Sequence, residues 1–381
     1  MARQVKYFEA IREAQAACLA ADKAVYVIGN NVPSPSGVFG TTTGLQDRFG
    51  ASRVRDMPSS ENGMTGVVLG SALVGMRPVL IHMRVDFAVL SMDLLVNQAA
   101  KWHYMYGGRM TAPITVRMIV GCGWGQGPQH SQSLQAWFAH VPGFKVVMPT
   151  TPHDAKGMLI AAIQDDAPVI VLEHRWLYNI DGPVPEGLYC EPLDTARIVR
   201  TGRHITLARL SYMTLECLSA AAMLAQIGVE AEVIDLRCLT PIDGDTLVGS
   251  VARTGHLIVA DTVQSAFGAG AEVVAIASER AFSTLKSPPA RLGLPHIPTP
   301  TTPALADLYY PRAKDIARLA LDRLGIEQDL PPEPPSDRPW RDVPDPEFTG
   351  PINRAAAIRI IFNKFDILYI AFQSIRIRKE I

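Results

Sequence analysis

Apolar residues along the chain form short continuous runs that alternate with longer segments of helical spacing. The first pair is an amphipathic segment at residues 8–21, followed by a β-branched run at 24–28. The pattern continues with a helix at 61–76, a strand at 78–83, a helix at 92–106, a strand at 113–120, a helix at 152–164 and a strand at 168–172. Short apolar strands that alternate with helices predict a parallel sheet covered on both faces.

A change of composition follows, because Pro183, Pro185 and Pro192 fall within one short stretch that is typical of a linker. The alternation then restarts and predicts a strand at 204–210, a helix at 214–227, strands at 230–236 and 256–260, a helix from Gly268 to about residue 282 and a last helix within 304–324. The sequence therefore predicts an α/β fold with two doubly wound domains, residues 1–180 and 193–327, joined by a linker at 181–192.

The end of the chain differs from both predicted domains. Residues 328–351 are rich in proline and are expected to form an extended strap. Residues 352–381 contain nine isoleucines and six basic residues against two acids. They form either a poorly ordered extension or an amphipathic helix that docks on a partner, and their role stays open.

Composition excludes several classes of protein. The chain has 381 residues, 48% apolar and 19% charged, with a net charge of −1. A protein that binds nucleic acid by neutralising phosphates should be basic, so we expect no nucleic-acid partner. Five scattered cysteines without a C-x-x-C pair argue against a disulfide framework and a structural zinc. We found neither a signal peptide nor an apolar run long enough for a bilayer, and therefore expect a cytoplasmic protein without membrane contact.

Two positions are candidates for chemistry. Glu61 stands where a loop enters the predicted Gly-rich helix. An acid in a first helical turn complements the helix dipole, but α/β sheets also place ligands at this edge. His130 follows a glycine-rich loop at 121–127 and is either an ordinary loop histidine or a group that transfers protons. This loop does not match G-x-G-x-x-G and leads into Pro128, so we expect no dinucleotide site.

Several longer motifs occur in a fixed order. They are GVFG at 37–40, SENG at 60–63, VNQAAK at 96–101, QHSQSLQAWFAH at 129–140, PGFKVV at 142–147, DAKG at 154–157 and VIDLR at 233–237. With these motifs the chain resembles the beta subunit of the thiamine-diphosphate-dependent 2-oxo acid dehydrogenases, the decarboxylating component of the pyruvate, branched-chain and acetoin complexes. The resemblance covers roughly residues 5–325. It implies a pyrimidine-binding transketolase-like domain followed by a transketolase C-terminal-like domain.

The resemblance also implies roles for individual residues. Glu61 matches the acid that hydrogen-bonds N1′ of the cofactor's aminopyrimidine, and such an acid is expected to lie in a dry pocket that raises its pKa. Phe87 matches the aromatic residue on the pyrimidine ring, with Met83 beside it, and His130 matches a histidine near the reacting carbon. A structural potassium ion would be bound by the backbone carbonyls of Ile114, Ala162, Ile163, Asp165 and Ala167.

One family motif is missing from the chain. The G-D-G…N-N sequence that binds the diphosphate and Mg²⁺ is absent, and in heteromeric members of the family it belongs to an alpha subunit. The resemblance therefore implies an α2β2 heterotetramer in which this chain holds the pyrimidine half of thiamine diphosphate. It further implies a small, pyruvate-like 2-oxo acid as substrate and a lipoyl acyltransferase core as acceptor of the acyl group.

Departures from the family pattern leave the substrate and the acyl acceptor open. They include Arg84 to Asp86, Leu90 and the segment from Asp261 to Gln264. Two alternatives therefore remain beside the dehydrogenase. One is a complex-free carboligase that joins the activated aldehyde to another carbonyl and forms an acyloin. The other is a non-catalytic scaffold with the same fold.

Overall fold

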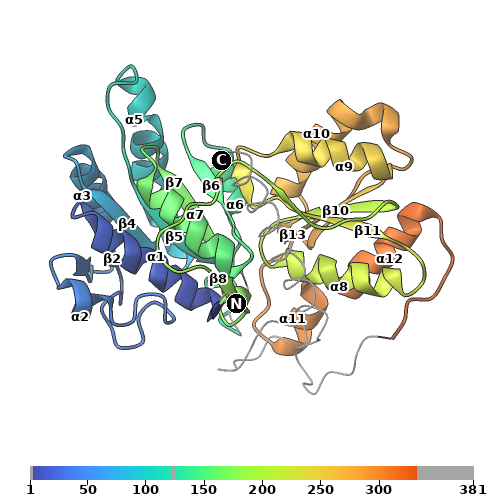
Figure 1. The fold of residues 1–381 in the computed structure, drawn as a ribbon, viewed down its shortest axis with the longest axis horizontal. Coiled ribbons are helices and arrows are strands. Elements are labelled where there is room, and N and C mark those ends of the chain that lie inside the picture. Colours follow the sequence, from blue (N-terminus) through green and yellow to red (C-terminus); the bar gives the residue numbers. More distant parts are fainter. Residues whose placement is uncertain (1–2, 122–124, 333–381) are drawn as a thin grey trace, which may run out of the picture.

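The computed structural model describes residues 3–121 and 125–332. Two α/β domains, each a sheet covered by helices, lie side by side (Figure 1). Most of the predicted strap at 328–351 and the whole tail at 352–381 lie outside the described residues. The predicted α/β class is confirmed by two mainly parallel sheets covered by helices. No helix among the described residues is long and apolar enough to span a bilayer.

The first sheet has seven strands in the order β12-β6-β7-β5-β4-β2-β3. Every neighbouring pair is parallel except β12 and β6. The strands are β2 (Val25–Gly29), β3 (Val54–Arg55), β4 (Arg77–His82), β5 (Thr115–Val120), β6 (Lys145–Val147), β7 (Val169–His174) and β12 (Cys238–Thr240). The helices are α1 (Tyr7–Ala21), α2 (Leu45–Phe49), α3 (Glu61–Leu73), α4 (Val85–Ala88), a π-helix (Asp93–Ala99), α5 (Ala100–Met105), α6 (Gln135–Ala139) and α7 (Pro152–Gln164).

The second sheet has five strands in the order β14-β13-β10-β11-β9, with β9 antiparallel to β11. The strands are β9 (Arg197–Arg200), β10 (Ile205–Arg209), β11 (Ala231–Asp235), β13 (Leu257–Gln264) and β14 (Ala290–Leu294). Helices α8 (Met213–Ala225) and α12 (Ala313–Leu324) cover one face, and α9 (Gly244–Thr254) and α10 (Ala269–Ala281) cover the other (Figure 1). Helix α11 (Pro303–Tyr309) precedes α12, and β1 (Arg3–Lys6) pairs with β8 (Asp181–Val184) in a separate two-stranded sheet.

Alternate strand residues divide the first sheet between two hydrophobic cores. Val27 and Val79 face one core with α1 and α7, while Ile28 and Leu80 face the other with α3. Successive residues of a strand point to opposite faces, so strands buried on both sides are apolar throughout. This explains why the strands appear in the sequence as continuous apolar runs.

Some predicted elements differ in detail from the structure. The helix expected at 92–106 begins as the π-helix and continues as α5. The region 304–324 is divided into α11 and α12, because Pro311 lacks the N–H group that a continuous helix needs. Strand β12 was not predicted, and it carries the chain of the second half back into the first sheet.

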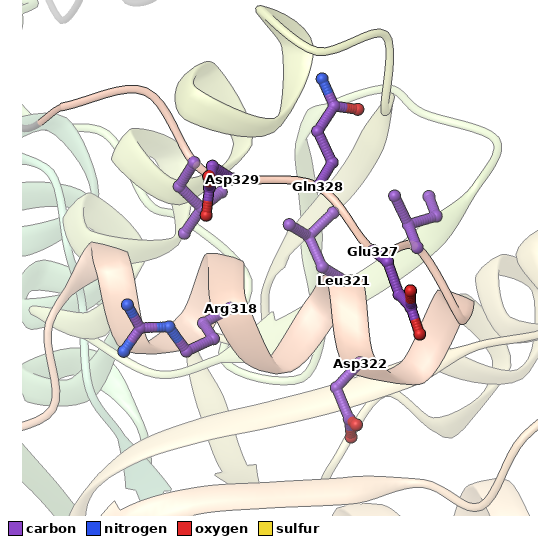
Figure 2. Close-up of a pocket in the computed structure, with 8 residues that line it drawn as sticks. Arg318, Leu321, Asp322, Glu327, Gln328 and Asp329 are labelled. Atoms are coloured by element: carbon purple, nitrogen blue, oxygen red, sulfur yellow. The ribbon is translucent and has the colours of Figure 1, made fainter.

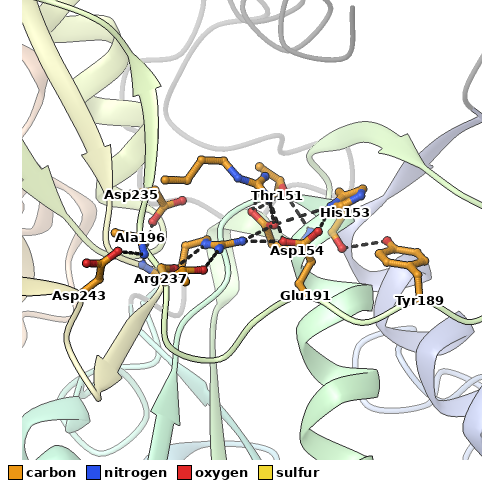
Figure 3. A network of polar contacts seen from close by, with 11 residues as sticks. Thr151, His153, Asp154, Tyr189, Glu191, Ala196, Asp235, Arg237 and Asp243 are labelled. Atoms are coloured by element: carbon orange, nitrogen blue, oxygen red, sulfur yellow. Dashed lines mark hydrogen bonds and ion pairs between the residues drawn. The ribbon is translucent and has the colours of Figure 1, made fainter. Parts of the chain in front are cut away.

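A buried ion network joins the two halves next to β12 (Figure 3). Arg237 Nη1 lies 3.1 Å from Asp154 Oδ1 and 2.9 Å from Glu191 Oε2, and Arg197 Nη2 contacts the same two oxygens at 3.0 and 2.9 Å. His153 Nδ1 lies 3.7 Å from both acids. Burial alone would raise the pKa of Asp154, but the charge of Arg197, the nearby His153 and the charge of Arg237 hold this pKa well below its usual range.

A second buried ion pair lies inside the first domain. Arg117 Nε and Nη2 donate to the two carboxylate oxygens of Glu173 at 2.6 and 2.8 Å, and both side chains are only 1% exposed. Gln15 accepts a further hydrogen bond from Arg117, and the hydroxyl of Tyr178 donates to Glu173 at 2.7 Å. These contacts tie α1 to β5 and β7 through polar groups that are almost completely satisfied.

We predict that Glu173→Gln destabilises the fold strongly, because it leaves the charge of Arg117 buried without a counter-ion. Removing one partner of a buried pair costs about 3–5 kcal/mol. Glu230→Gln is the matched control, since Glu230 pairs with Arg203 on the surface and such pairs contribute less than about 1 kcal/mol. Urea unfolding of both variants measures the difference, and equal losses would contradict the prediction.

Candidate active site

Glu61 is the first residue of α3, on the loop that follows β3. Thr65 fixes this turn, because its hydroxyl donates to the carbonyl of Glu61 at 2.7 Å and contacts Ser91 Oγ at 2.9 Å. Within this chain Glu61 is half-buried, and the next two residues are exposed. The dry pocket expected for this acid is therefore not formed by the described residues of the single chain.

Phe87 and His130 lie in contact at the same edge of the first sheet. Their ring centroids are 5.3 Å apart, and the rings meet edge to face at 82°. Phe87 belongs to α4, which follows β4, and His130 lies beyond the glycine loop that follows β5. The carboxyl ends of neighbouring parallel strands meet at one sheet edge, and this arrangement brings the two side chains together.

Met83 and Glu61 lie at this edge too. The half-buried Met83 follows β4, and its sulfur contacts Asn31 Nδ2 at 3.6 Å beyond the end of β2. Asn30 donates to the carbonyl of Met57 at 3.2 Å, on the loop that leads to Glu61. Asn30 and Asn31 thus connect the end of β2 to the loop before Glu61 and to Met83. The structure brings Phe87 and His130 into direct contact and places Glu61 and Met83 on adjoining elements.

The five carbonyls predicted for potassium gather at the opposite, amino-terminal edge of the sheet. Arg77 Nη1 donates to the carbonyls of Ile163 and Asp165 at 3.3 and 3.0 Å. Thr115 Oγ1 donates to the carbonyl of Ala162 at 3.1 Å, and the carbonyl of Ile114 accepts from the amide of Val169 at 3.0 Å. Ala167 belongs to the same turn, where its amide donates to Asp165 Oδ1 at 2.9 Å. A guanidinium therefore already uses one lone pair on each of two carbonyls, and any cation there would lie remote from Glu61.

Gly121 and Gly127, which lie in the glycine-rich segment before His130, both approach side chains of other segments closely. At Gly121, where φ is +85°, an added Cβ would overlap Nε2 of His174. His174 is buried and stacks on Tyr212 with centroids 4.8 Å apart. Burial and the charges of Arg84 and Arg312 lower its pKa to about 3, so it is neutral. An added Cβ at Gly127 would lie 2.9 Å from Oγ1 of Thr301 in the second domain.

Residues without a predicted role also contact the His130 segment. Gln132 Nε2 donates to Asp86 Oδ1 at 2.8 Å, and Gln135 Nε2 donates to Asp261 Oδ1 at 2.8 Å. Burial raises the pKa of both acids, and that of Asp261 rises to about 6. Asp86 and Asp261 depart from the family pattern, and this departure was the only feature of the sequence that could have singled them out. The sequence could not show that they bind Gln132 and Gln135, because these partners are distant along the chain.

A pocket of about 460 Å³ lies elsewhere, at the end of α12 (Figure 2). Its lining is largely polar and includes Arg318, Asp322, Glu327 and Asp329. None of the predicted site residues lines this pocket, and the sheet edge with Glu61 and His130 remains the candidate site.

Comparison with known proteins gives two domain matches. Residues 3–180 match the model of the transketolase pyrimidine-binding domain, and residues 194–316 match the transketolase C-terminal domain. A split-gene transketolase, described as an inactive beta4 tetramer, aligns with a TM-score of 0.69 at 21% identity, over 85% of this chain and 100% of that chain. This likeness concerns the fold alone. The matches define a protein of transketolase type.

Two relatives narrow the class. The beta subunit of acetoin:2,6-dichlorophenolindophenol oxidoreductase from Cupriavidus necator is 41% identical over 330 residues, which are 84% of this chain and 97% of the relative. The mitochondrial pyruvate dehydrogenase E1 component subunit beta from Homo sapiens is 37% identical over 320 residues, 83% of this chain and 89% of the relative. The chain belongs to the family of beta subunits of the 2-oxo acid dehydrogenases of acetoin and pyruvate type, as its motifs indicated.

We predict that Gly121→Ala disrupts the loop that positions His130. A left-handed conformation costs a residue with Cβ about 1–2 kcal/mol, and the overlap with His174 adds a further loss of about 1–3 kcal/mol. Gly75→Ala is the matched control, because Gly75 has φ +99° and open space around it. Urea unfolding should show a larger loss for Gly121→Ala, and equal losses would mean that the contact with His174 is unimportant.

Proposed function

We propose that this chain is the beta subunit of a thiamine-diphosphate-dependent enzyme that oxidatively decarboxylates a small, pyruvate-like 2-oxo acid and transfers the acyl group to lipoamide. The observation that carries the proposal is the gathering of Glu61, Met83, Phe87 and His130 at one sheet edge of the domain that matches the pyrimidine-binding model. When bound, the cofactor supplies the nucleophilic carbon and the electron sink for C–C cleavage.

The residues at this edge fit the pyrimidine half of the cofactor chemically. Glu61 offers a carboxyl group that can hold a proton on a ring nitrogen, and Phe87 and Met83 offer an aromatic and a polarisable surface for a flat ring. The ring of His130 meets Phe87 edge to face, so the imidazole adjoins the aromatic ring that is proposed to pack on the pyrimidine. In the proposed enzyme His130 orients the substrate carbonyl or moves a proton beside it.

The proposed site needs a second chain to exclude water. Glu61 is half-buried, and the nearby apolar side chains Val67 and Leu90 are 59% and 62% exposed. Exposed apolar residues beside a functional edge are typical of an interface. We propose that an alpha subunit covers this edge in an α2β2 assembly and supplies the ligands for the diphosphate and Mg²⁺. We also propose that the backbone carbonyls near Arg77 bind a potassium ion with a structural role.

Acetoin is a second candidate substrate, favoured by the acetoin oxidoreductase relatives at 41% and 39% identity. Cleavage of acetoin and decarboxylation of pyruvate leave the same two-carbon fragment, so the same residues would serve both reactions. A carboligase would use the same edge with another carbonyl as acceptor. Turnover with pyruvate, branched-chain 2-oxo acids and acetoin, each with and without lipoamide, distinguishes these activities.

We predict that the chain alone neither binds thiamine diphosphate tightly nor turns over any of these substrates. Addition of the alpha subunit from the same organism should produce activity that depends on thiamine diphosphate and Mg²⁺, because the diphosphate ligands are absent from this sequence. Isothermal titration of the cofactor into each sample, with dye reduction as the activity assay, measures both effects. Micromolar affinity of the isolated chain for thiamine diphosphate would contradict the proposal that the cofactor site is divided between this chain and the alpha subunit.

We predict that Glu61→Gln leaves the assembly folded and lowers kcat by about 10²–10⁴-fold, the usual loss when one positioned acid–base group is removed. Glu272→Gln is the matched control, since Glu272 is an exposed acid in the first turn of α10. Glu272 complements the dipole of α10 and is not one of the proposed site residues, so its replacement should leave kcat unchanged. Similar kcat values for Glu61→Gln and Glu272→Gln would mean that Glu61 only complements the dipole of α3 and has no role in catalysis.

A further inference from the structure

Two glutamines fasten the segment that carries His130, one to each domain. Gln132 binds Asp86 in α4 of the first domain, and Gln135 binds Asp261 in β13 of the second. The amide of Gly121 also donates to the carbonyl of Gln132 at 3.1 Å. The segment between His130 and the start of α6 is therefore short and held at both domains.

The contact between Gln135 and Asp261 leaves two oxygens unsatisfied. Oε1 of Gln135 and Oδ2 of Asp261 are buried without a hydrogen-bond partner among the described residues. The two residues are 0% and 5% exposed, so solvent does not compensate. An amide oxygen and an ionised carboxylate are both acceptors and cannot satisfy one another. A proton on Oδ2 would turn that oxygen into a donor, which the unsatisfied Oε1 of Gln135 could accept.

The surroundings of Asp261 keep this proton bound at mildly acidic pH, below about pH 6. Burial raises the pKa of Asp261 to about 6, although the Thr262 amide and the Gln135 side chain, which both donate to Oδ1, and the nearby Gly270 amide favour the ionised form. These groups come from β13, α6 and α10, and all three are neutral. Burial raises the pKa of Asp86 too, but there the charge of Arg84 is among the groups that favour the ionised form.

We propose that Asp261 is a positioning residue for His130: as a neutral carboxylic acid it forms a doubly hydrogen-bonded pair with the amide of Gln135, which fixes the His130 segment against the second domain. The inference rests on the proposed function, in which His130 lies beside the reacting atoms. Loss of the proton leaves one hydrogen bond and a buried charge, so the segment is held less firmly as the pH rises above about 6.

Asp261→Asn tests the pair without any activity assay, because asparagine offers the same donor and acceptor at every pH. A carboxyl group whose pKa is raised in the folded chain stabilises it at low pH, and this stability is lost as the pH rises from about 4 to about 6. The full-length Asp261→Asn chain should therefore have a Tm several degrees above wild type at neutral pH. The difference should disappear near pH ~4.

Asp245→Asn is the control for this comparison, because Asp245 is an exposed acid in the same domain, paired with Arg280. Its Tm should equal that of wild type at both pH values. Hydrogen exchange at neutral pH should also show stronger protection of residues 130–139 in Asp261→Asn than in wild type. A lower Tm for Asp261→Asn at neutral pH, or a Tm difference that does not change with pH, would overturn the proposal.

Activity of the assembly with the alpha subunit tests the positioning role. Asp261→Asn should retain most of kcat, while Asp261→Leu, which cannot bind Gln135, should lose roughly 10–100-fold in kcat with little change in KM. Equal losses in both variants would mean that the anion is required and would refute the neutral pair. If the wild-type assembly shows no thiamine-dependent turnover, the proposed function fails, and the Tm comparison still decides whether the pair exists.

Discussion

The charge cluster around Arg237 is the constraint on which the arrangement of the two domains depends. A single guanidinium that follows β11 binds Asp154 at the start of α7 and Glu191 in the linker (Figure 3). Buried charges are tolerated only when paired, so these three segments cannot separate without a large loss of stability. Strand β12 follows directly and pairs with β6 of the first sheet. The hydrogen bond between Gln135 and Asp261 is a further contact between the two domains.

The direction of the strands separates two kinds of site. Carboxyl ends of β4 and β5 lead to Phe87 and His130, whereas the amino ends of β4 and β5 lie beside Arg77 and the carbonyls predicted for potassium. At the first edge, Gly125 and Gly127 lie close to Thr301 of the second domain. The second edge is tied by hydrogen bonds into the fold and serves stability.

Much of the secondary structure could be predicted from local sequence, whereas contacts between residues distant in sequence could not. Helix α7 and the apolar strands follow from periodicity, and Glu61 at the start of α3 follows from the loop and the Gly-rich helix after it. Strand β12 has only three residues and depends on a partner far away in sequence. Gln135 and Asp261 are 126 positions apart, and Arg77 meets Asp165 across 88, so no local pattern could pair them.

The half-buried state of Glu61 follows from the same architecture. An acid at the first turn of a helix on a sheet edge has protein behind it and open space in front, so one chain cannot surround it. A proton shared between a carboxyl group and a ring nitrogen requires the removal of water, since hydration favours the ionised acid. Val67 on α3 and Leu90 after α4 are exposed apolar side chains that such a covering surface could also bury. In the proposed enzyme, the acid–base chemistry of Glu61 therefore depends on the alpha subunit that is proposed to cover this edge.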